Sequence, residues 1–265
     1  MRLLHTSDWH LGRGLHGVDL HEAQESVLAQ IVATVSAEQV DAVLISGDVF
    51  DRAVPPLASV RLWSQTLRQI SELAPVIVIP GNHDSATRLG VGADLYRDGV
   101  HIASELSQIG TPILLADDHG LVAFYPIPFL DPDMSRRVLS DDEEALPRSH
   151  EAVLTAAMAR IRRDLDARRL AQPSTRAVVM AHAFVIAGPA ADAVRSDSER
   201  DIRVGGVESV SSHIFSGVDY VALGHLHGSQ RVDGERVRYS GSPLRYSFSE
   251  VHQTKQVLIV DLDAG

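Results

Sequence analysis

The stretch Ala42-Val43-Leu44-Ile45-Ser46-Gly47-Asp48-Val49-Phe50-Asp51 indicates the fold of this chain more clearly than any other. Its first five residues are apolar or small, and so short a run predicts a buried β-strand at residues 42–46. The glycine that follows allows a tight backbone turn, which places the carboxylate of Asp48 at the end of the strand. A polar group at the end of a buried strand is typical of a site at the edge of an α/β sheet.

The segments on either side of this strand also predict an α/β fold. Residues 20–38 repeat apolar side chains with the helical period, and residues 57–73 predict a second helix after the Pro55-Pro56 break. Residues 3–6 and 76–79 predict two further strands. The first third of the chain therefore alternates strands and helices, with polar motifs where open α/β sheets place their sites.

The rest of the chain predicts several strands and one long helix, at residues 151–170. Strands are expected at residues 100–103, 111–115, 120–125, 177–181, 220–223, 230–232, 237–240 and 256–262. Residues 131–147 and 187–206 are expected to form polar loops. Because we find no internal repeat and no linker, we expect one domain over residues 1–265. Its predicted fold is an α/β (α+β) sandwich of four layers, in which helices flank two β-sheets.

Five short motifs along the chain carry carboxylate, amide and imidazole groups. They are Asp8-Trp9-His10, Gly47-Asp48-Val49-Phe50-Asp51, Gly81-Asn82-His83-Asp84, Ala181-His182 and Gly224-His225-Leu226-His227. Asp, Asn and His side chains hold Mn²⁺, Fe²⁺ or Zn²⁺ through oxygen and imidazole nitrogen. One such motif alone is weak, but the ordered set predicts a phosphoesterase site that binds two divalent metal ions.

The spacing of these residues suggests a division of roles. We expect Asp48 to bridge the two ions. The first ion is assigned to Asp8, His10 and His227, and the second to Asn82, His182 and His225. Two ions about 3.5–4 Å apart can clamp a phosphate and lower the pKa of a bridging water, which then attacks phosphorus as hydroxide.

His83 is expected to be catalytic without binding metal, because it directly follows the ligand Asn82. It can donate a proton to the leaving oxygen or stabilise the transition state. Asp84 is expected to orient the ring of His83 and to raise its pKa. Asp51 has two interpretations, a partner of the site or a cap of the following turn. His5 is more simply explained as a buried core residue.

Composition limits the function further. The chain has no cysteine, which excludes disulfides, thiolate metal sites and a cysteine nucleophile. This is compatible with a reducing cytosol, and the first residues do not form a signal peptide, so we expect a cytoplasmic protein without a membrane span. The formal net charge of −11 argues against a free-standing tight binder of nucleic acid, but not against an enzyme that acts on one.

In order and spacing, the five motifs resemble those of the calcineurin-like metallophosphoesterase superfamily. Over nearly the whole chain, the sequence is also similar to the SbcD family of exonuclease subunits. The segments that carry this second resemblance are residues 4–12, 47–51, 55–56, 80–85, 196–200, 204–206, 220–227 and 239–244. Trp9 and the Gly241-Ser242-Pro243-Leu244 element favour the SbcD branch within the superfamily.

The resemblance implies a metal-dependent DNA nuclease with 3′-to-5′ exonuclease and single-strand endonuclease activity, acting in DNA recombination, repair and replication. It implies two divalent ions, with Mn²⁺ favoured over Mg²⁺, Fe²⁺ or Zn²⁺. It also implies a homodimer and a partner ATPase of the SbcC type that recognises DNA ends. The family carries a capping domain and docking segments after the nuclease core, and these are expected to be absent from residues 1–265.

Two other functions compete with the nuclease. The first is a phosphodiesterase or phosphatase of the same superfamily that acts on small molecules, and an assay of linear DNA against nucleotide esters separates the two. The second is a scaffold protein with an idle metal site. The presence of every expected ligand type argues against the scaffold.

Overall fold

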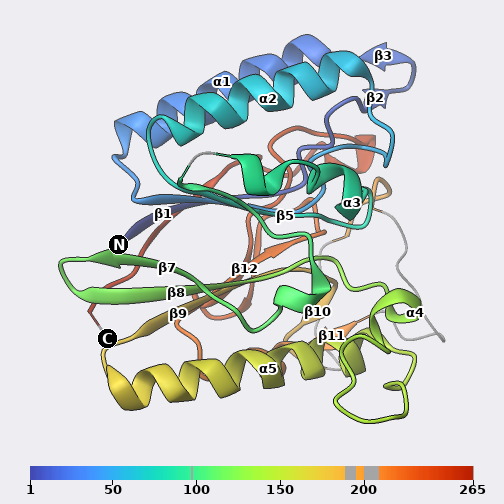
Figure 1. Cartoon of the computed structure of the whole chain (residues 1–265). Helices are drawn as coiled ribbons and strands as arrows, with labels where there is room; N and C mark the ends of the chain where they lie inside the picture. The colour runs from blue at the N-terminus through green and yellow to red at the C-terminus, as the bar shows by residue number, and fades with distance from the viewer. Residues whose placement is uncertain (97, 189–194, 200–208, 265) are drawn as a thin grey trace.

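Two packed β-sheets form the centre of the molecule in the computed structural model, which describes residues 1–96, 98–188, 195–199 and 209–264 (Figure 1). The first sheet has the strand order β15-β1-β4-β5-β6. Its strands are β1 (Arg2–Thr6), β4 (Ala42–Ser46), β5 (Val76–Ile79), β6 (Val100–Ile102) and β15 (Leu258–Asp261). β15 pairs antiparallel with β1 and the other pairs are parallel, so the carboxyl ends of β1, β4 and β5 meet at one edge.

The second sheet has the strand order β13-β14-β12-β9-β8-β7. Its strands are β7 (Ile113–Asp117), β8 (Gly120–Ile127), β9 (Arg176–His182), β12 (Tyr220–Gly224), β13 (Gln230–Asp233) and β14 (Val237–Tyr239). The central strands β8, β9, β12 and β14 are parallel, whereas β7 and β13 pair antiparallel at the two edges. The carboxyl ends of β9 and β12 therefore also lie together.

Helices cover the outer face of each sheet. α1 (His21–Ala37) and α2 (Leu57–Ser71) lie on the first sheet, and α5 (His150–Ala171) lies on the second (Figure 1). The side chains of β1 alternate between two cores, because Leu4 packs with the residues of α1 and α2 whereas Leu3 packs between the sheets. The order helix, sheet, sheet, helix confirms the predicted four-layer fold class.

Shorter elements connect these layers. They are β2 (Gly14–Leu15), β3 (Val18–Asp19), α3 (Ala86–Leu89), α4 (Pro132–Ser135), β10 (Val185–Ile186), β11 (Val210–Ser211) and 3₁₀ turns at Ala93–Leu95, Leu106–Gln108, Ser212–Phe215 and Phe248–Glu250. Within the described part of the chain, no helix is both long and apolar enough to cross a bilayer.

Each expected helix and strand is present, with ends displaced by a few residues at most. One expectation was wrong in detail, because residues 131–147 contain α4. The side chain of Asp131 accepts a hydrogen bond from the Asp133 amide and Pro132 takes the first helical position, which are two signals that start a helix. The loop expected at residues 187–206 lies largely outside the described residues.

Candidate metal centre

Polar side chains of both sheets meet where their parallel strands end. Asp8 and His10 follow β1, Asp48 follows β4, Asn82 and His83 follow β5, His182 ends β9, and His225 and His227 follow β12. Ligand-type atoms of Asp8, His10 and His227 lie within 4.8 Å of one another, as do those of Asp8, Asp48 and His182. The structure therefore gathers residues that the sequence analysis took from five separate motifs.

The backbone is strained at several of these residues. Asp8, His10, Asp48 and His225 have φ values of 54°, 45°, 51° and 111°, which non-glycine residues rarely adopt. Hydrogen bonds hold the first two turns against each other, since the Asp8 amide donates to the Gly47 carbonyl at 3.0 Å and the His10 amide to the Asp48 carbonyl at 2.9 Å. Strain of this kind persists where the surrounding structure enforces it, as at functional sites.

Gly224 lets the two sheets approach closely beside the site. A Cβ atom at this position would lie 1.9 Å from the carbonyl oxygen of Ser46 at the end of β4. The same oxygen accepts a hydrogen bond from Nδ1 of His182 at 2.9 Å. A side chain at Gly224 would therefore force apart the strand ends that present Asp48 and His182.

Asp48 lies at the centre of the cluster. Its Oδ2 atom is 3.5 Å from Nε2 of His182, 3.6 Å from Nε2 of His10 and 4.0 Å from Nε2 of His83. Its Oδ1 atom accepts a hydrogen bond from the His83 amide at 2.8 Å. One carboxylate thus faces imidazoles from both sheets, which is the geometry that a bridging ligand needs.

The remaining groups fall on two sides of Asp48. On one side, Nε2 of His10 and Nε2 of His227 are 3.0 Å apart. On the other side, Oδ1 of Asn82 is 2.9 Å from Nε2 of His182 and 3.3 Å from Nδ1 of His225. The structure thus places His10 beside His227, and Asn82 beside His182 and His225; their assignment to two separate ions stays a prediction.

Burial strongly perturbs the charges of these groups. Burial raises the pKa of Asp8 to about 7, and it lowers the pKa of His10 and of His225 well below the usual value. Burial also disfavours charge on His182, but the Asp48 carboxylate outweighs it and raises the pKa of His182 to about 9. The buried imidazoles of His10 and His225 are therefore held neutral, which is the form that binds metal.

The donor set fits divalent cations. Carboxylate, amide and imidazole groups converge on one buried region, and no thiolate is available. Among the described residues, Nε2 of His225 is buried and has no hydrogen-bond partner, whereas its Nδ1 atom lies 3.3 Å from Oδ1 of Asn82.

His83 approaches Asp48 but takes its orientation from the backbone. Its Nδ1 atom is 2.7 Å from the carbonyl oxygen of Asp51, and because a carbonyl can only accept, Nδ1 carries the proton. The expected role of Asp84 was wrong. Its carboxylate accepts hydrogen bonds from the backbone amides of Val49 (3.1 Å), Phe50 (2.9 Å) and Gly81 (2.9 Å), so it holds two loops together instead of orienting the His83 ring.

The structure also shows the surroundings of Asp51 and His5. The carboxylate of Asp51 lies 3.7 Å from Nδ1 of His10 and 3.5 Å from Nη1 of Arg13, which favours the interpretation as a partner of the site. His5 is a core residue, as expected. Its ring nitrogens contact the Tyr220 hydroxyl at 2.9 Å and the Leu223 carbonyl at 3.1 Å, and burial lowers its pKa to about 3.

Two buried glutamates beside the site were missed by the sequence analysis. Glu199 accepts a hydrogen bond from the His227 amide at 2.7 Å, and Glu250 accepts one from Nδ1 of His227 at 2.9 Å. Glu199 lies in a segment that the resemblance had highlighted without giving it a role. Glu250 carried no signal, because it stands outside every metal motif.

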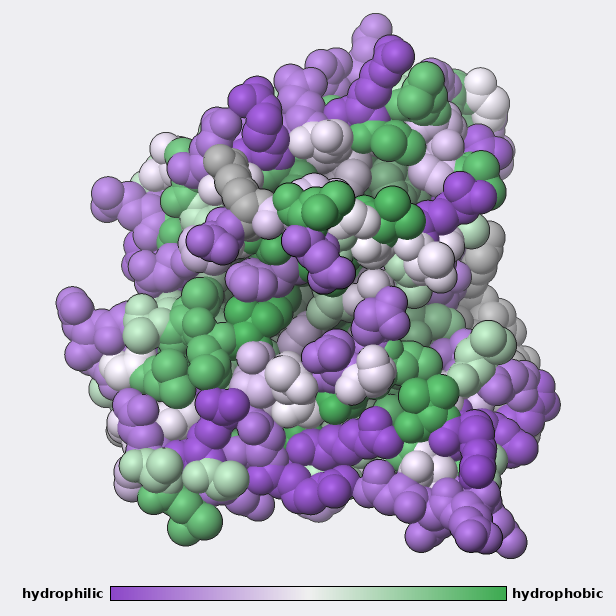
Figure 2. Space-filling model, viewed as in Figure 1, coloured by the Kyte–Doolittle hydropathy of each residue, from purple (hydrophilic) through white to green (hydrophobic). Residues whose placement is uncertain are grey.

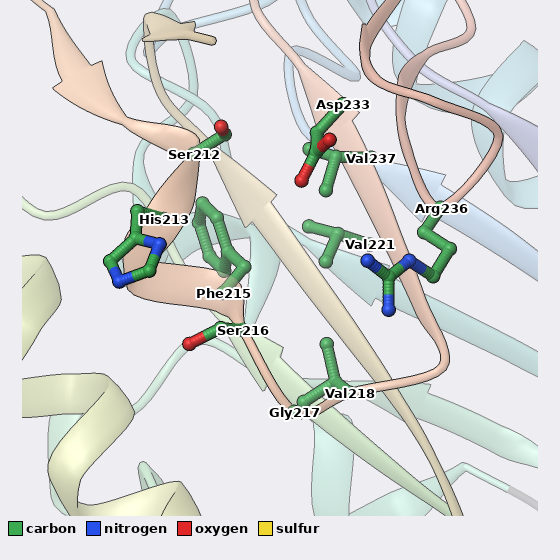
Figure 3. A pocket seen from close by; sticks show the side chains of 10 residues that line it. All are labelled: Ser212, His213, Phe215, Ser216, Gly217, Val218, Val221, Asp233, Arg236 and Val237. Atoms are coloured by element: carbon green, nitrogen blue, oxygen red, sulfur yellow. The ribbon is translucent and has the colours of Figure 1, made fainter. Parts of the chain in front are cut away.

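A separate hollow of about 170 Å³ lies between β12, β14 and the Ser212–Phe215 turn (Figure 3). Its walls include Phe215, Val221, Asp233 and Arg236. None of the predicted metal ligands lines this hollow, so it is not part of the candidate metal centre.

Comparison with known proteins identifies relatives of the whole chain. The sequence model of the family described as Calcineurin-like phosphoesterase matches residues 1–229. The SbcD component of the nuclease SbcCD from Bacillus subtilis is 36% identical over 274 aligned residues, which cover 100% of this chain and 67% of the relative. The protein of the same name from Staphylococcus saprophyticus is 33% identical in sequence to this chain, and the alignment covers 99% of this chain and 66% of the relative. The chain therefore spans about two thirds of the length of these relatives.

Solved structures show the same fold at lower sequence identity. The phosphopantetheinyl hydrolase of Mycobacterium tuberculosis superposes with a TM-score of 0.54 at 18% identity, covering 98% of this chain and 96% of that one. At this identity the likeness concerns the fold alone. The sequence match over residues 1–229 and the identity to longer relatives lead to one conclusion: this chain belongs to the calcineurin-like phosphoesterase family.

Proposed function

We propose that this chain is a DNA nuclease that hydrolyses phosphodiester bonds with two divalent ions, Mn²⁺ being the preferred metal. The observation that carries the proposal is the position of Asp48, whose Oδ2 atom lies 3.5–3.6 Å from imidazoles of both sheets. Membership of the phosphoesterase family supports divalent metal ions as cofactors. The relatives named as the SbcD component of the nuclease SbcCD support DNA as the substrate.

In this proposal Asp48 bridges the two ions. Asp8, His10 and His227 hold one ion, and Asn82, His182 and His225 hold the other. Bound ions of this type act as Lewis acids that orient the phosphate and activate water. The protein contributes the buried imidazoles and the strained turns that keep the donors in place before any ion arrives.

His83 is the proposed proton donor to the leaving oxygen. Its Nδ1 proton is committed to the Asp51 carbonyl, so Nε2, 4.0 Å from Asp48, is the atom that can give up a proton when the ring is charged. A ring fixed by a backbone carbonyl keeps this nitrogen directed into the site.

DNA would be bound through its phosphates, with little reading of the bases. The chain has a net charge of −11, so the attraction for phosphate must be local to the metal centre. Cleavage is accordingly expected to be nearly indifferent to base sequence and to weaken as salt concentration rises. A partner ATPase of the SbcC type and a cytoplasmic location belong to the same proposal.

The direct test compares substrates in one assay. The purified chain is incubated with labelled linear DNA, single-stranded and duplex, and in parallel with nucleotide esters, with Mn²⁺, Mg²⁺ or a chelator. We expect Mn²⁺-dependent cleavage of DNA that the chelator abolishes. Turnover of nucleotide esters without DNA cleavage would instead support the small-molecule phosphodiesterase, and inertness toward both substrates would support the scaffold.

We also propose that the chain forms a homodimer. Apolar side chains gather at the surface over α3 (Figure 2). Val54, Val91 and Leu95 are 63%, 70% and 88% exposed, and a hollow of about 440 Å³ next to them is lined by Trp63 and Tyr96 among others. An exposed apolar patch of this kind supports an interface with a second copy of the chain.

A further inference from the structure

We propose that Glu250 is a positioning residue that fixes the ring of His227, and that Lys255 holds Glu250 in place. The proposal rests on the metal-binding function proposed above and adds residues that lie beyond position 229, where the match to the family model ends. It assigns a role to the segment at residues 240–255, which supplies none of the predicted metal ligands.

The carboxylate of Glu250 is buried and fully engaged. Its Oε1 atom accepts hydrogen bonds from Nδ1 of His227 at 2.9 Å, from Oγ of Ser196 at 2.9 Å and from Oγ of Ser198. Its Oε2 atom accepts from the Tyr246 amide at 3.0 Å and from Nζ of Lys255 at 2.7 Å. Because five donors surround two oxygens, the carboxylate has one stable orientation.

These contacts determine which nitrogen of His227 carries the proton. The Ser198 hydroxyl has a single hydrogen, which it donates to Glu250. Its oxygen lies 2.7 Å from Nδ1 of His227, so it can only accept a hydrogen bond from that nitrogen. Both neighbours of Nδ1 are then acceptors, and the proton resides on Nδ1. Nε2 keeps its lone pair and faces Nε2 of His10 at 3.0 Å, inside the candidate metal centre.

Lys255 links Glu250 to the backbone of His227, the residue that Glu250 orients. It is the single lysine of the sequence, and its side chain is 9% exposed. Its Nζ atom donates to the His227 carbonyl at 2.9 Å, to Oγ of Ser242 at 2.8 Å and to Oε1 of Gln253 at 2.8 Å, besides its contact with Glu250. Glu250 therefore holds the ring of His227 while Lys255 holds its carbonyl.

Close packing of the same segment requires glycine at position 241. Gly241 has a φ of 79°, and a Cβ atom there would lie 2.7 Å from the His227 carbonyl oxygen and 2.7 Å from the Ser229 amide. The Ser242 amide donates to that carbonyl at 3.1 Å. The segment thus packs directly on the backbone of His227.

Metal binding by the full chain tests the proposal. In Glu250→Gln the side chain keeps one acceptor oxygen and gains an NH2 group that only donates, so it cannot accept all five hydrogen bonds. We expect Mn²⁺ affinity to fall about 10–100-fold at one of the two sites, as for other lost partners of metal-binding histidines. The second site should keep its affinity, and thermal unfolding without metal should show a folded protein.

Asp219→Asn provides the matched control. Asp219 also accepts hydrogen bonds from a basic side chain and a backbone amide, those of Arg169 at 2.9 Å and Ala177 at 2.7 Å, but it contacts none of the predicted ligands. This variant should bind Mn²⁺ at both sites as the wild type does. Equal loss at both sites in Glu250→Gln, or no loss at either, overturns the proposal.

A second measurement is independent of any metal. In the metal-free wild type, ¹⁵N NMR of the imidazoles should show His227 protonated at Nδ1, with its signals assigned by their loss in His227→Asn. Protonation at Nε2 overturns the positioning role. If the wild type bound no Mn²⁺ at all, the proposed function would fail while this NMR result still decided the role of Glu250.

Discussion

The Nε2 atoms of His10 and His227 lie 3.0 Å apart in a buried site, although 217 residues separate them in the chain. Two imidazole nitrogens at this distance need a shared proton or a cation between them, because two lone pairs repel. Nδ1 of His227 already donates to Glu250, so its Nε2 presents a lone pair. That lone pair can accept a hydrogen bond from Nε2 of His10 or bind a cation, and the first two predictions concern cation binding.

Asp48→Ala should remove both metal ions and all nuclease activity. Asp48 is the group whose carboxylate faces histidines of both sheets, so neither ligand set is complete without it. Metal analysis of the purified variant measures this directly. Two ions per chain in Asp48→Ala would contradict the bridging role, and Asp219→Asn should retain both.

His83→Gln should lower turnover by roughly 10²–10⁴-fold, the usual cost of losing a general acid or base. Metal content should remain that of the wild type, since Nδ1 of His83 is bound to the Asp51 carbonyl and only its Nε2 faces the site. Single-turnover kinetics together with metal analysis separate the two effects. An empty metal site in this variant would show that His83 is a ligand.

Asp84→Ala should lower the free energy of unfolding, because the Asp84 carboxylate holds two loops together and does not orient the His83 ring. The substitution leaves three buried backbone donors, those of Val49, Phe50 and Gly81, without an acceptor. Each such group costs about 1–3 kcal/mol. Chemical unfolding of the metal-free protein measures the loss, and an unchanged free energy of unfolding would contradict the stabilising role of Asp84.

Asp117 should make stability depend on pH. Hydrogen bonds from Arg176, which is 3% exposed, lower the pKa of Asp117. A lowered pKa stabilises the fold above the ordinary value of about 3.9, and this stabilisation is lost as pH falls through the lower, folded-state pKa. Asp117→Asn should cost about 3–5 kcal/mol at pH 7 and less at acidic pH, because it leaves the buried guanidinium of Arg176 with backbone carbonyls but no opposite charge.

The exposed ion pair of Asp133 and Arg148 provides the comparison for Asp117. It joins the same residue types at 2.5 Å, but both side chains are more than half exposed. Its loss in Asp133→Asn should barely change the free energy of unfolding. Equal effects of the two substitutions in urea unfolding at pH 7 would contradict the importance of burial.

Val91→Asp should convert the proposed dimer to a monomer. Val91 is 70% exposed beside the apolar hollow, so a charge there should disrupt an interface without affecting the fold. Light scattering after size exclusion measures the mass. Leu170→Asp, at an 87% exposed position in α5, is the control and should remain dimeric. A monomeric wild type would refute the interface.

The sequence predicted the layers and the convergence of the motifs because both follow from local patterns. Apolar runs followed by Asp8, Asp48, Asn82 or His225 place polar groups at strand ends, and parallel strands end at one edge. The sequence could not show that Asp84 contacts backbone amides and not the His83 ring, since neighbouring side chains can point in different directions. Glu250 was missed because its partner, His227, lies 23 residues away and no periodic pattern connects them.

Gly224 marks the place where two halves of the chain, which must fold against one another, approach most closely beside the site. Before residue 110 the chain supplies Asp8, His10, Asp48 and Asn82, and after it His182, His225 and His227. Neither half alone contains both proposed ligand sets. The proposed binding of two ions therefore requires that distant segments dock first, which is a slow kind of folding step. Metal uptake during refolding would therefore report the moment at which the two sheets come together.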